Sequence, residues 1–246
     1  MNKLLIILTL LIGGATFAQT ADEIIKKAED RMRGTSSYAE MTITTIRPKW
    51  QREMKIKTWT KGDDYSVTLV MSPAKDQGTV FLKRDKEMWN YIPSIERTIK
   101  MPPSMLTQSW MGTDMTNDDL VKESSLEDDY TKKIIGSEII EGLDCYKIVL
   151  TPKANVNSIW GKIYIWISKK DYLQLRTKFY DEDNKMVNTI LGKDVKMMGG
   201  KLIPTTMEII PADKKGHKTR VAYTKAIFDG KVDDNMFTIQ HIKRIK

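Results

Sequence analysis

The chain has 246 residues, a formal net charge of +8 and 41% hydrophobic residues, which is typical of a folded globular protein and too apolar for a disordered one. It contains 15 Met and 6 Trp, but only two His and one Cys. A single Cys excludes an internal disulfide, and two His cannot supply a three-His metal centre. This composition predicts a non-enzymatic protein with no metal and no cofactor.

Residues 1–18 have the pattern of a secretory signal peptide. Lys3 precedes an apolar run over residues 4–12, and small residues follow as far as Ala18. The alternative, a short membrane anchor, is disfavoured because the run is too short to span a bilayer. No Cys lies near the predicted cleavage site to accept a lipid. We therefore expect residues 19–246 to form a single domain that is exported to the periplasm without lipidation.

A helix is predicted at the start of this domain. Thr20 and Glu23 have the spacing of a capping box, and Gly34 is a typical stop. The apolar residues between them recur on one helical face: Ile24, Ile25, Ala28 and Met32.

From Ser37 onward the apolar period changes to two, which predicts β-strands joined by tight polar turns. Such a succession favours an antiparallel meander over βαβ units, and a dozen strands in one sheet must curl. We predict an α+β fold, mostly antiparallel β, that forms an incomplete barrel of about 11–12 strands. The alternating runs cover residues 41–46, 54–59, 65–71, 79–83, 88–92, 97–101, 132–140, 145–151, 162–168, 174–180, 187–196, 202–210 and 218–228.

One segment, residues 102–125, interrupts the strands. It carries several large apolar side chains and is predicted to form short helices, the second of them capped by Thr116. Two interpretations remain open: a lid over a cavity for acyl chains, or ordinary packing at the mouth of the core.

Two stretches carry a family resemblance. Residues 88–93 (MWNYIP) with the following Arg97, and residues 109–120 (SWMGTDMTNDDL), resemble the LolA-like outer-membrane lipoprotein-sorting proteins, and residues 229–238 resemble the closing segment of that family. The resemblance implies an incomplete barrel, with helices that close one side around a hydrophobic cavity. It also implies a monomeric soluble carrier of acylated lipoprotein or lipid, which works between an inner-membrane transporter and an outer-membrane acceptor. The alternative is an accessory subunit docked on a lipid transporter of the RND or MMPL type.

Candidate cavity residues follow from this resemblance and from the adaptability of Met and Trp side chains. Period two places Met88 on one face of its strand and Trp89 on the other, and the sequence leaves open which face is interior. Arg97 is a candidate for binding a headgroup or for latching the lid to Asp114 or Asp118, against the alternative of an ordinary edge-strand cation. The candidates for the cavity and its lid are Trp89, Tyr91, Met101, Met105, Trp110, Met111 and Met115.

The positive charge is dispersed in small pairs such as Lys83-Arg84 and Lys132-Lys133. We expect these pairs to form a solvated surface, with attraction to anionic membranes or an acidic partner as the alternative. The exported chain shows no pattern that combines basic and stacking residues, so nucleic acid is not an expected partner.

Overall fold

The computed structural model describes residues 19–245 except 118, 120–128, 155 and 157. The predicted signal peptide, residues 1–18, lies outside the described residues. No helix among those described is both long and apolar enough to cross a membrane.

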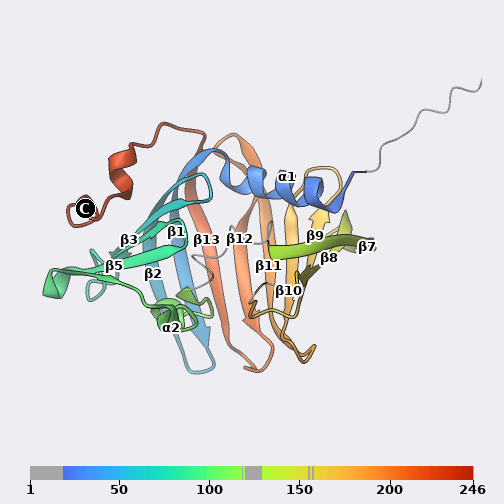
Figure 1. The fold of residues 1–246 in the computed structure, drawn as a ribbon, viewed down its shortest axis with the longest axis horizontal. Helices are drawn as coiled ribbons and strands as arrows, with labels where there is room; N and C mark the ends of the chain where they lie inside the picture. Colours follow the sequence, from blue (N-terminus) through green and yellow to red (C-terminus); the bar gives the residue numbers. More distant parts are fainter. Residues whose placement is uncertain (1–18, 118, 120–128, 155, 157, 246) are drawn as a thin grey trace, which may run out of the picture.

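Over the described residues, thirteen strands and four short helical segments follow the N-terminal helix α1 (Ala21–Arg33) (Figure 1). The helical segments are η1 (Pro93–Ile95), α2 (Pro103–Leu106), η2 (Trp110–Gly112) and η4 (Asp234–Phe237). The strands are β1 (Ser36–Arg47), β2 (Trp50–Lys61), β3 (Tyr65–Ser72), β4 (Val80–Arg84), β5 (Glu87–Ile92), β6 (Arg97–Lys100), β7 (Tyr130–Ile140), β8 (Leu143–Pro152), β9 (Lys162–Ser168), β10 (Gln174–Tyr180), β11 (Met186–Met198), β12 (Lys201–Pro211) and β13 (Lys218–Phe228).

All thirteen strands belong to one antiparallel sheet in the order β6-β5-β4-β3-β2-β1-β13-β12-β11-β10-β9-β8-β7. Among the described strands, β1 and β13 are the one pair of sheet neighbours that is distant in the sequence, and the other neighbours follow one another along the chain. The sheet is open, with β6 and β7 as its edges. The predicted mostly antiparallel architecture is confirmed. The predicted count of 11–12 strands is corrected to 13 over the described residues, because each of the thirteen alternating runs, including the short run 97–101, contains a strand.

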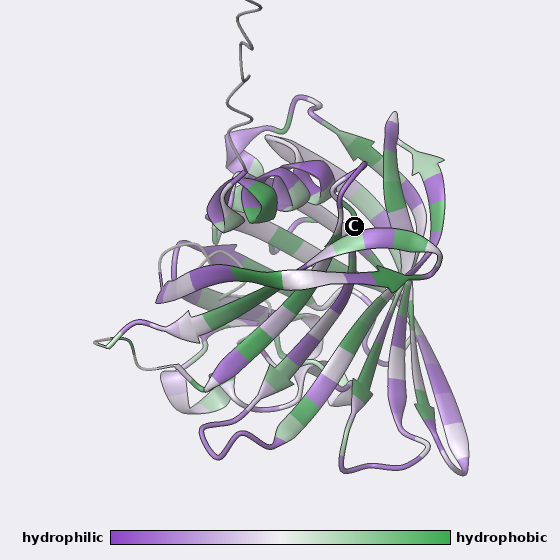
Figure 2. Cartoon of the chain, turned by 90° about the vertical axis from the view of Figure 1, so that its right-hand side faces the viewer, coloured by the Kyte–Doolittle hydropathy of each residue, from purple (hydrophilic) through white to green (hydrophobic). Residues whose placement is uncertain are grey.

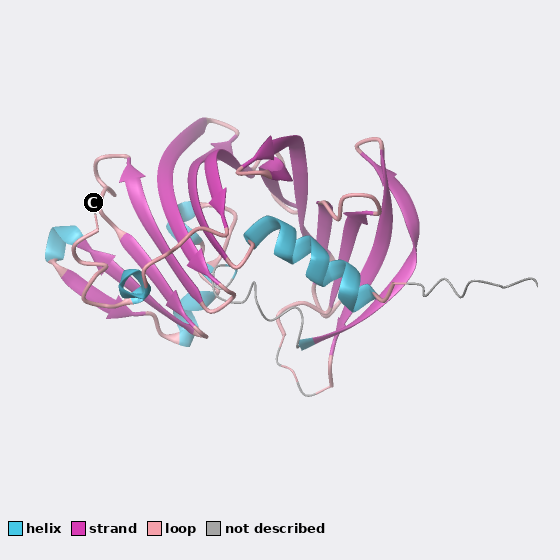
Figure 3. Ribbon diagram, turned by 90° about the horizontal axis from the view of Figure 1, so that it is seen from above, coloured by secondary structure: helices cyan, strands magenta, loops and turns pink. Residues whose placement is uncertain are grey.

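Helix α1 begins and ends as its sequence predicts. The Thr20 hydroxyl accepts a hydrogen bond from the Glu23 backbone N–H, and the Glu23 carboxylate accepts one from the Thr20 backbone N–H. Gly34 ends the helix with a φ of 64°, a conformation that glycine adopts without strain. The apolar side of α1 packs on the inner face of β8 and β9, against Ile148 and Ile163. Seen from above, α1 lies between the two curved halves of the sheet (Figure 3).

Alternation along the strands gives the sheet two different faces (Figure 2). On β4, Phe81 packs into an inner apolar cluster, whereas Leu82 packs into a separate outer cluster. The C-terminal segment covers this part of the outer face, with Phe237 and Ile242 buried against β3 and β4 (Figure 1). The outer face of β4 is therefore covered by the C-terminal segment.

A buried carboxylate joins three strands on the outer face. Glu208 of β12 is 4% exposed and accepts hydrogen bonds from Lys193 of β11 and from Lys218 and Arg220 of β13. Burial raises the pKa of this carboxyl, but the three cations outweigh burial and lower the pKa to about 2, from an ordinary value of 4.5. The cluster thus stabilises the centre of the sheet only while Glu208 is ionised.

Lowering the pH should show that the cluster stabilises the sheet only while Glu208 is ionised. Because the pKa of Glu208 is lower in the folded than in the unfolded state, its stabilising contribution is complete above pH 4.5 and is lost as the pH falls toward 2. Over this window we expect the thermal midpoint of the wild type to fall more steeply than that of Glu208→Gln. The exposed Glu182→Gln serves as the control and should follow the wild type. Parallel curves for the wild type and Glu208→Gln would contradict the assignment.

Candidate functional site: an amphipathic cavity

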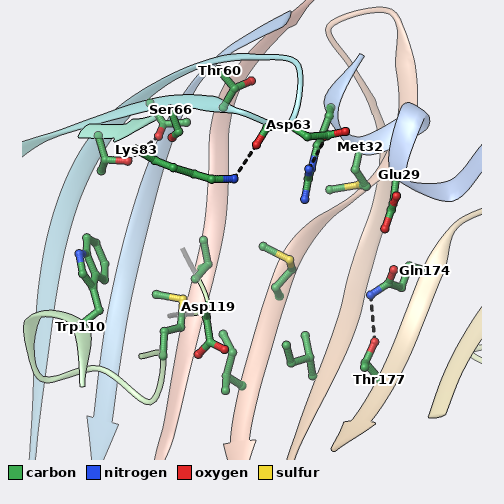
Figure 4. A pocket seen from close by; sticks show the side chains of 18 of the residues that line it. Glu29, Met32, Thr60, Asp63, Ser66, Lys83, Trp110, Asp119, Gln174 and Thr177 are labelled. Atoms are coloured by element: carbon green, nitrogen blue, oxygen red, sulfur yellow. Dashed lines mark hydrogen bonds and ion pairs between the residues drawn. The ribbon is translucent and has the colours of Figure 1, made fainter. Parts of the chain in front are cut away.

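A cavity of about 410 Å³ lies on the inner face of the sheet. Side chains of α1, of β1 to β5 and of β10 to β13 line it, together with the segment around Trp110 (Figure 4). Much of its wall is aliphatic, aromatic or Met: Ala39, Met41, Ile43, Ile56, Phe81, Met88, Trp110, Met115, Ile190, Met207, Ile209 and Val221.

Strand register arranges the lining of β1 to β4 in rows that differ in polarity. Ser37, Thr60, Ser66 and Lys83 are successive register partners across the four strands. Two residues further along, the row consists of Ala39, Thr58, Thr68 and Phe81. The next row contains Met41 and Ile56. The wall thus changes along the strands from a row of hydroxyls and one ammonium to a row of apolar side chains.

Trp110 forms part of the apolar end. Its ring meets the ring of Phe81 edge-on, with centroids 5.4 Å apart, and the residue is only 1% exposed. A tight loop holds the residue: the Trp110 backbone N–H donates to the Met115 carbonyl over 2.8 Å, and the Thr113 hydroxyl donates to the Trp110 carbonyl over 2.7 Å. Gly112 has a φ of 73° in this loop, which accounts for a glycine there.

Asp114 fastens this loop to the sheet. Its carboxylate accepts hydrogen bonds from the Arg47 guanidinium over 2.9 Å and from the Thr219 hydroxyl over 2.8 Å. The side chains of Arg47 and Asp114 are only 10% and 6% exposed. Arg52 adds a hydrogen bond to the Met111 carbonyl. We call Arg47, Arg52, Asp114 and Thr219 the loop latch.

The structure brings together only part of the predicted set. Trp110 and Met115 line the cavity. Met101 and Met111 pack on the same apolar cluster without lining the cavity, and Met105 is 37% exposed.

Trp89 and Tyr91 lie on the opposite face of β5, in the outer cluster with Phe237. They are therefore placed outside the cavity, and Met88, the alternate residue on the same strand, lines it instead. The physical reason is the period of two combined with the covering of the outer face by the C-terminal segment.

The structure also differs from the predicted contact between Arg97 and Asp114. Arg97 is exposed on the edge strand β6, and the carboxylate of Asp114 is held by Arg47, not by Arg97. The other predicted partner of Arg97, Asp118, lies outside the described residues. The Thr116 hydroxyl accepts a hydrogen bond from the Asp119 backbone N–H over 3.1 Å, as a cap does, while residues 118 and 120–125 of the predicted second helix lie outside the described residues.

Two lysines predicted to be on the solvated surface are buried. Lys83 is 6% exposed and faces the cavity, and the side chain of Lys132 is 3% exposed and pairs with Asp22 of α1 over 2.7 Å. Sequence reasoning missed Lys83 because it judged the Lys83-Arg84 pair by composition. The period of two along β4 carried the missing signal, since it puts Lys83 on the same face as Phe81. Among the described residues, no group of three or more His, Cys, Asp and Glu side chains could hold a metal ion.

The loop latch can be tested by stability. Breaking a buried ion pair by removing one partner costs about 3–5 kcal/mol, because the other charge stays buried without its counterion. We therefore expect Asp114→Ala to lower the free energy of unfolding by that order in urea titrations. Arg97→Ala, at an exposed position, should stay within about 0.5 kcal/mol of the wild type. The reverse ranking would show that Arg97 holds the loop.

These features define a class of protein: an open, curved antiparallel sheet whose inner face encloses a largely apolar cavity. A family model described as "Uncharacterized protein" matches residues 62–244, about three quarters of the chain, and the chain belongs to this family. A search of curated proteins found no match.

Solved structures share the fold over most of the chain. A DUF1329 family protein from Desulfovibrio piger is 23% identical, with a TM-score of 0.82 over 90% of this chain and 97% of its own. A putative outer membrane lipoprotein-sorting protein domain from Vibrio parahaemolyticus is 21% identical, with a TM-score of 0.79 over 91% of this chain and 98% of its own. A LolA superfamily protein from Nitrosomonas europaea is also 21% identical, with a TM-score of 0.76 over 91% of this chain and 100% of its own. The predicted resemblance to LolA-like proteins is thus confirmed at the level of the fold.

Proposed function

We propose that this protein is a soluble periplasmic carrier, which shields the acyl chains of lipoproteins or related lipids in its cavity during transfer to the outer membrane. The observation that carries the proposal is the cavity of about 410 Å³ with a largely apolar wall on the inner face of the sheet. The signal-peptide pattern of residues 1–18 supports export, and a neighbour of the same fold is a putative outer membrane lipoprotein-sorting protein domain.

The chemistry of the wall suits cargo that has to be released. Each CH₂ group removed from water contributes about 0.8 kcal/mol, so a long acyl chain cannot cross an aqueous gap without cover. Met side chains are flexible and adapt to irregular apolar partners. Met41, Met115 and Met207 line the cavity from three different parts of the chain, and Trp110 also lines it. Such a wall binds a chain by contact area and imposes no fixed shape on it.

In this proposal residues 19–246 act as one lipid-binding domain. Helix α1 and the Trp110 loop cover the inner face of the sheet from its two halves and close one side around the cargo. The cargo passes from an inner-membrane transporter to an outer-membrane acceptor, and no covalent chemistry is needed.

Filling the cavity should abolish binding. Met207 lies on β12 with its side chain in the cavity wall, and Met207→Trp would place an indole in the space for an acyl chain. The matched control is Met197→Trp, because Met197 of β11 is 66% exposed. We expect the protein, purified without detergent, to enhance the fluorescence of N-phenyl-1-naphthylamine, and palmitate to displace this probe.

Met207→Trp should reduce affinity for the probe at least about tenfold, since the new side chain competes for the same volume. Met197→Trp should bind as the wild type does. A wild type that does not bind the probe, or a Met207→Trp variant with unchanged affinity, would contradict the proposed function. Thermal melts of both variants show whether each is folded.

A further inference from the structure

Two turns lie side by side at one end of the sheet. The β1–β2 turn, residues 48–49, and the β12–β13 turn, residues 212–217, are neighbours because β1 pairs with β13. A Cβ placed on Gly216 would lie 3.3 Å from the ring of Pro48, so the two turns lie against each other. Both are found at the lower edge of the molecule in Figure 1. We call these two turns, together with Trp50 at the start of β2, the double-hairpin tip.

Trp50 is the large apolar side chain of this tip, and it is 53% exposed. Its register partner on β1 is Arg47, whose guanidinium lies 5.8 Å from the centroid of the Trp50 ring. This cation–π contact orients the indole. Because side chains alternate along β2, Trp50 faces the same side as Arg52, which donates to the Met111 carbonyl. Trp50 therefore lies on the inner-face side of the sheet, next to the loop latch.

The tip also carries a positive charge. The exposed charged side chains of its two turns are those of Lys49, Lys214 and Lys215, against one carboxylate, that of Asp213. A single exposed Trp is common on protein surfaces. A Trp that is surrounded by lysines at a protruding turn, however, has the composition that suits the headgroup layer of an anionic membrane. Indole rings concentrate in that layer, and anionic lipids attract lysines close to it.

The positive charge does not continue along this end of the molecule. The next turn, between β10 and β11, carries Asp181, Glu182 and Asp183, which an anionic surface repels. In the other direction lies α2, where Met105 is 37% exposed and adds a second apolar side chain (Figure 1). A membrane surface therefore fits the tip on the side of α2 and the Trp110 loop.

We propose that the double-hairpin tip docks on an anionic phospholipid membrane, with the indole of Trp50 among the headgroups and the lysines on lipid phosphates. The loop latch connects this site to the cavity, since Arg47 contacts Trp50 and also pairs with Asp114 of the Trp110 loop. Docking would bring that loop, and the part of the cavity wall that it carries, to the membrane surface. The inference goes beyond the proposed function, because docking by the tip needs no cargo.

The first comparison tests the indole. Co-sedimentation measures how the protein partitions onto vesicles of phosphatidylcholine, with and without phosphatidylglycerol. Trp50→Ala should weaken binding to the vesicles that contain phosphatidylglycerol about tenfold, because it removes apolar surface that the headgroup layer would cover. The matched control is Met197→Ala, which removes an apolar side chain that is 66% exposed on β11 and should bind as the wild type does.

The second comparison tests the charge. The wild type should bind vesicles with phosphatidylglycerol at least about tenfold more tightly than vesicles without it, and added salt should reduce the difference. Lys214→Gln/Lys215→Gln should lose most of this preference. The control Lys86→Gln/Lys170→Gln makes the same change of charge on two exposed turns, β4–β5 and β9–β10, at the other end of the strands, and should keep it.

A wild type that binds both kinds of vesicle equally, or neither, would overturn the inference. An unchanged partition of Trp50→Ala or of Lys214→Gln/Lys215→Gln would overturn it as well. All variants should still enhance the fluorescence of N-phenyl-1-naphthylamine as the wild type does, which shows that their cavity is folded. Because this probe reports on the cavity separately, a negative result with vesicles would leave the carrier function standing.

Discussion

The register of β1, β2, β3 and β4 is the constraint on which the cavity depends. The three pairings align side chains of the four strands in rows across the sheet, and the row of Ser37, Thr60, Ser66 and Lys83 is polar. A slip of one residue would turn every inner side chain outward and bring the other set to the cavity. Lys83 and Phe81 face inward only because Leu82, between them, is held in the outer cluster. The outer cluster and the cavity therefore determine each other.

Over the part of the chain that the structure describes, all strands belong to one open sheet, and two segments pack on its inner face in different ways. Helix α1 uses apolar packing over β8 and β9, which is the usual role of an amphipathic helix. The Trp110 loop has little regular structure and depends on the loop latch, above all on the pair of Arg47 and Asp114. Both segments contribute side chains to the cavity wall, so the shape of the cavity depends on the buried polar contacts of the loop latch as well as on the apolar packing of α1.

Local patterns in the sequence predict the strands and the capped helix α1, because alternation and capping depend on neighbours a few residues apart. Pairings between distant residues have no such local signal. Arg47 and Asp114 lie 67 positions apart, and nothing near either residue indicates the partner, so the sequence offered Arg97 instead. The sequence also separated Met88 from Trp89 without showing which of them faces inward. The C-terminal segment decides this by covering the outer face, where Trp89 and Tyr91 pack.

Lys83 shows how a charge pattern in the sequence can mislead about the position of a side chain. By composition it is one member of a surface pair, whereas by period it shares a face with Phe81, and the period is correct. Buried charge is uncommon in proteins and usually has a structural or a binding role. Here the charge lies in the cavity wall, in the same register row as Ser66 and Thr60. The alternation of side chains along β4 would have predicted that Lys83 faces inward, if it had been given more weight than the charge of the residue.

The central claim is that the cavity holds an aliphatic ligand. The most direct measurement is native mass spectrometry of the protein purified from its own cells without detergent. The account predicts one bound species per chain, which collisional activation releases as an acylated molecule. It also predicts that the bound species is absent from the Met207→Trp variant. A wild-type mass equal to the bare chain under the gentlest conditions, or a bound species without an aliphatic chain, would contradict it.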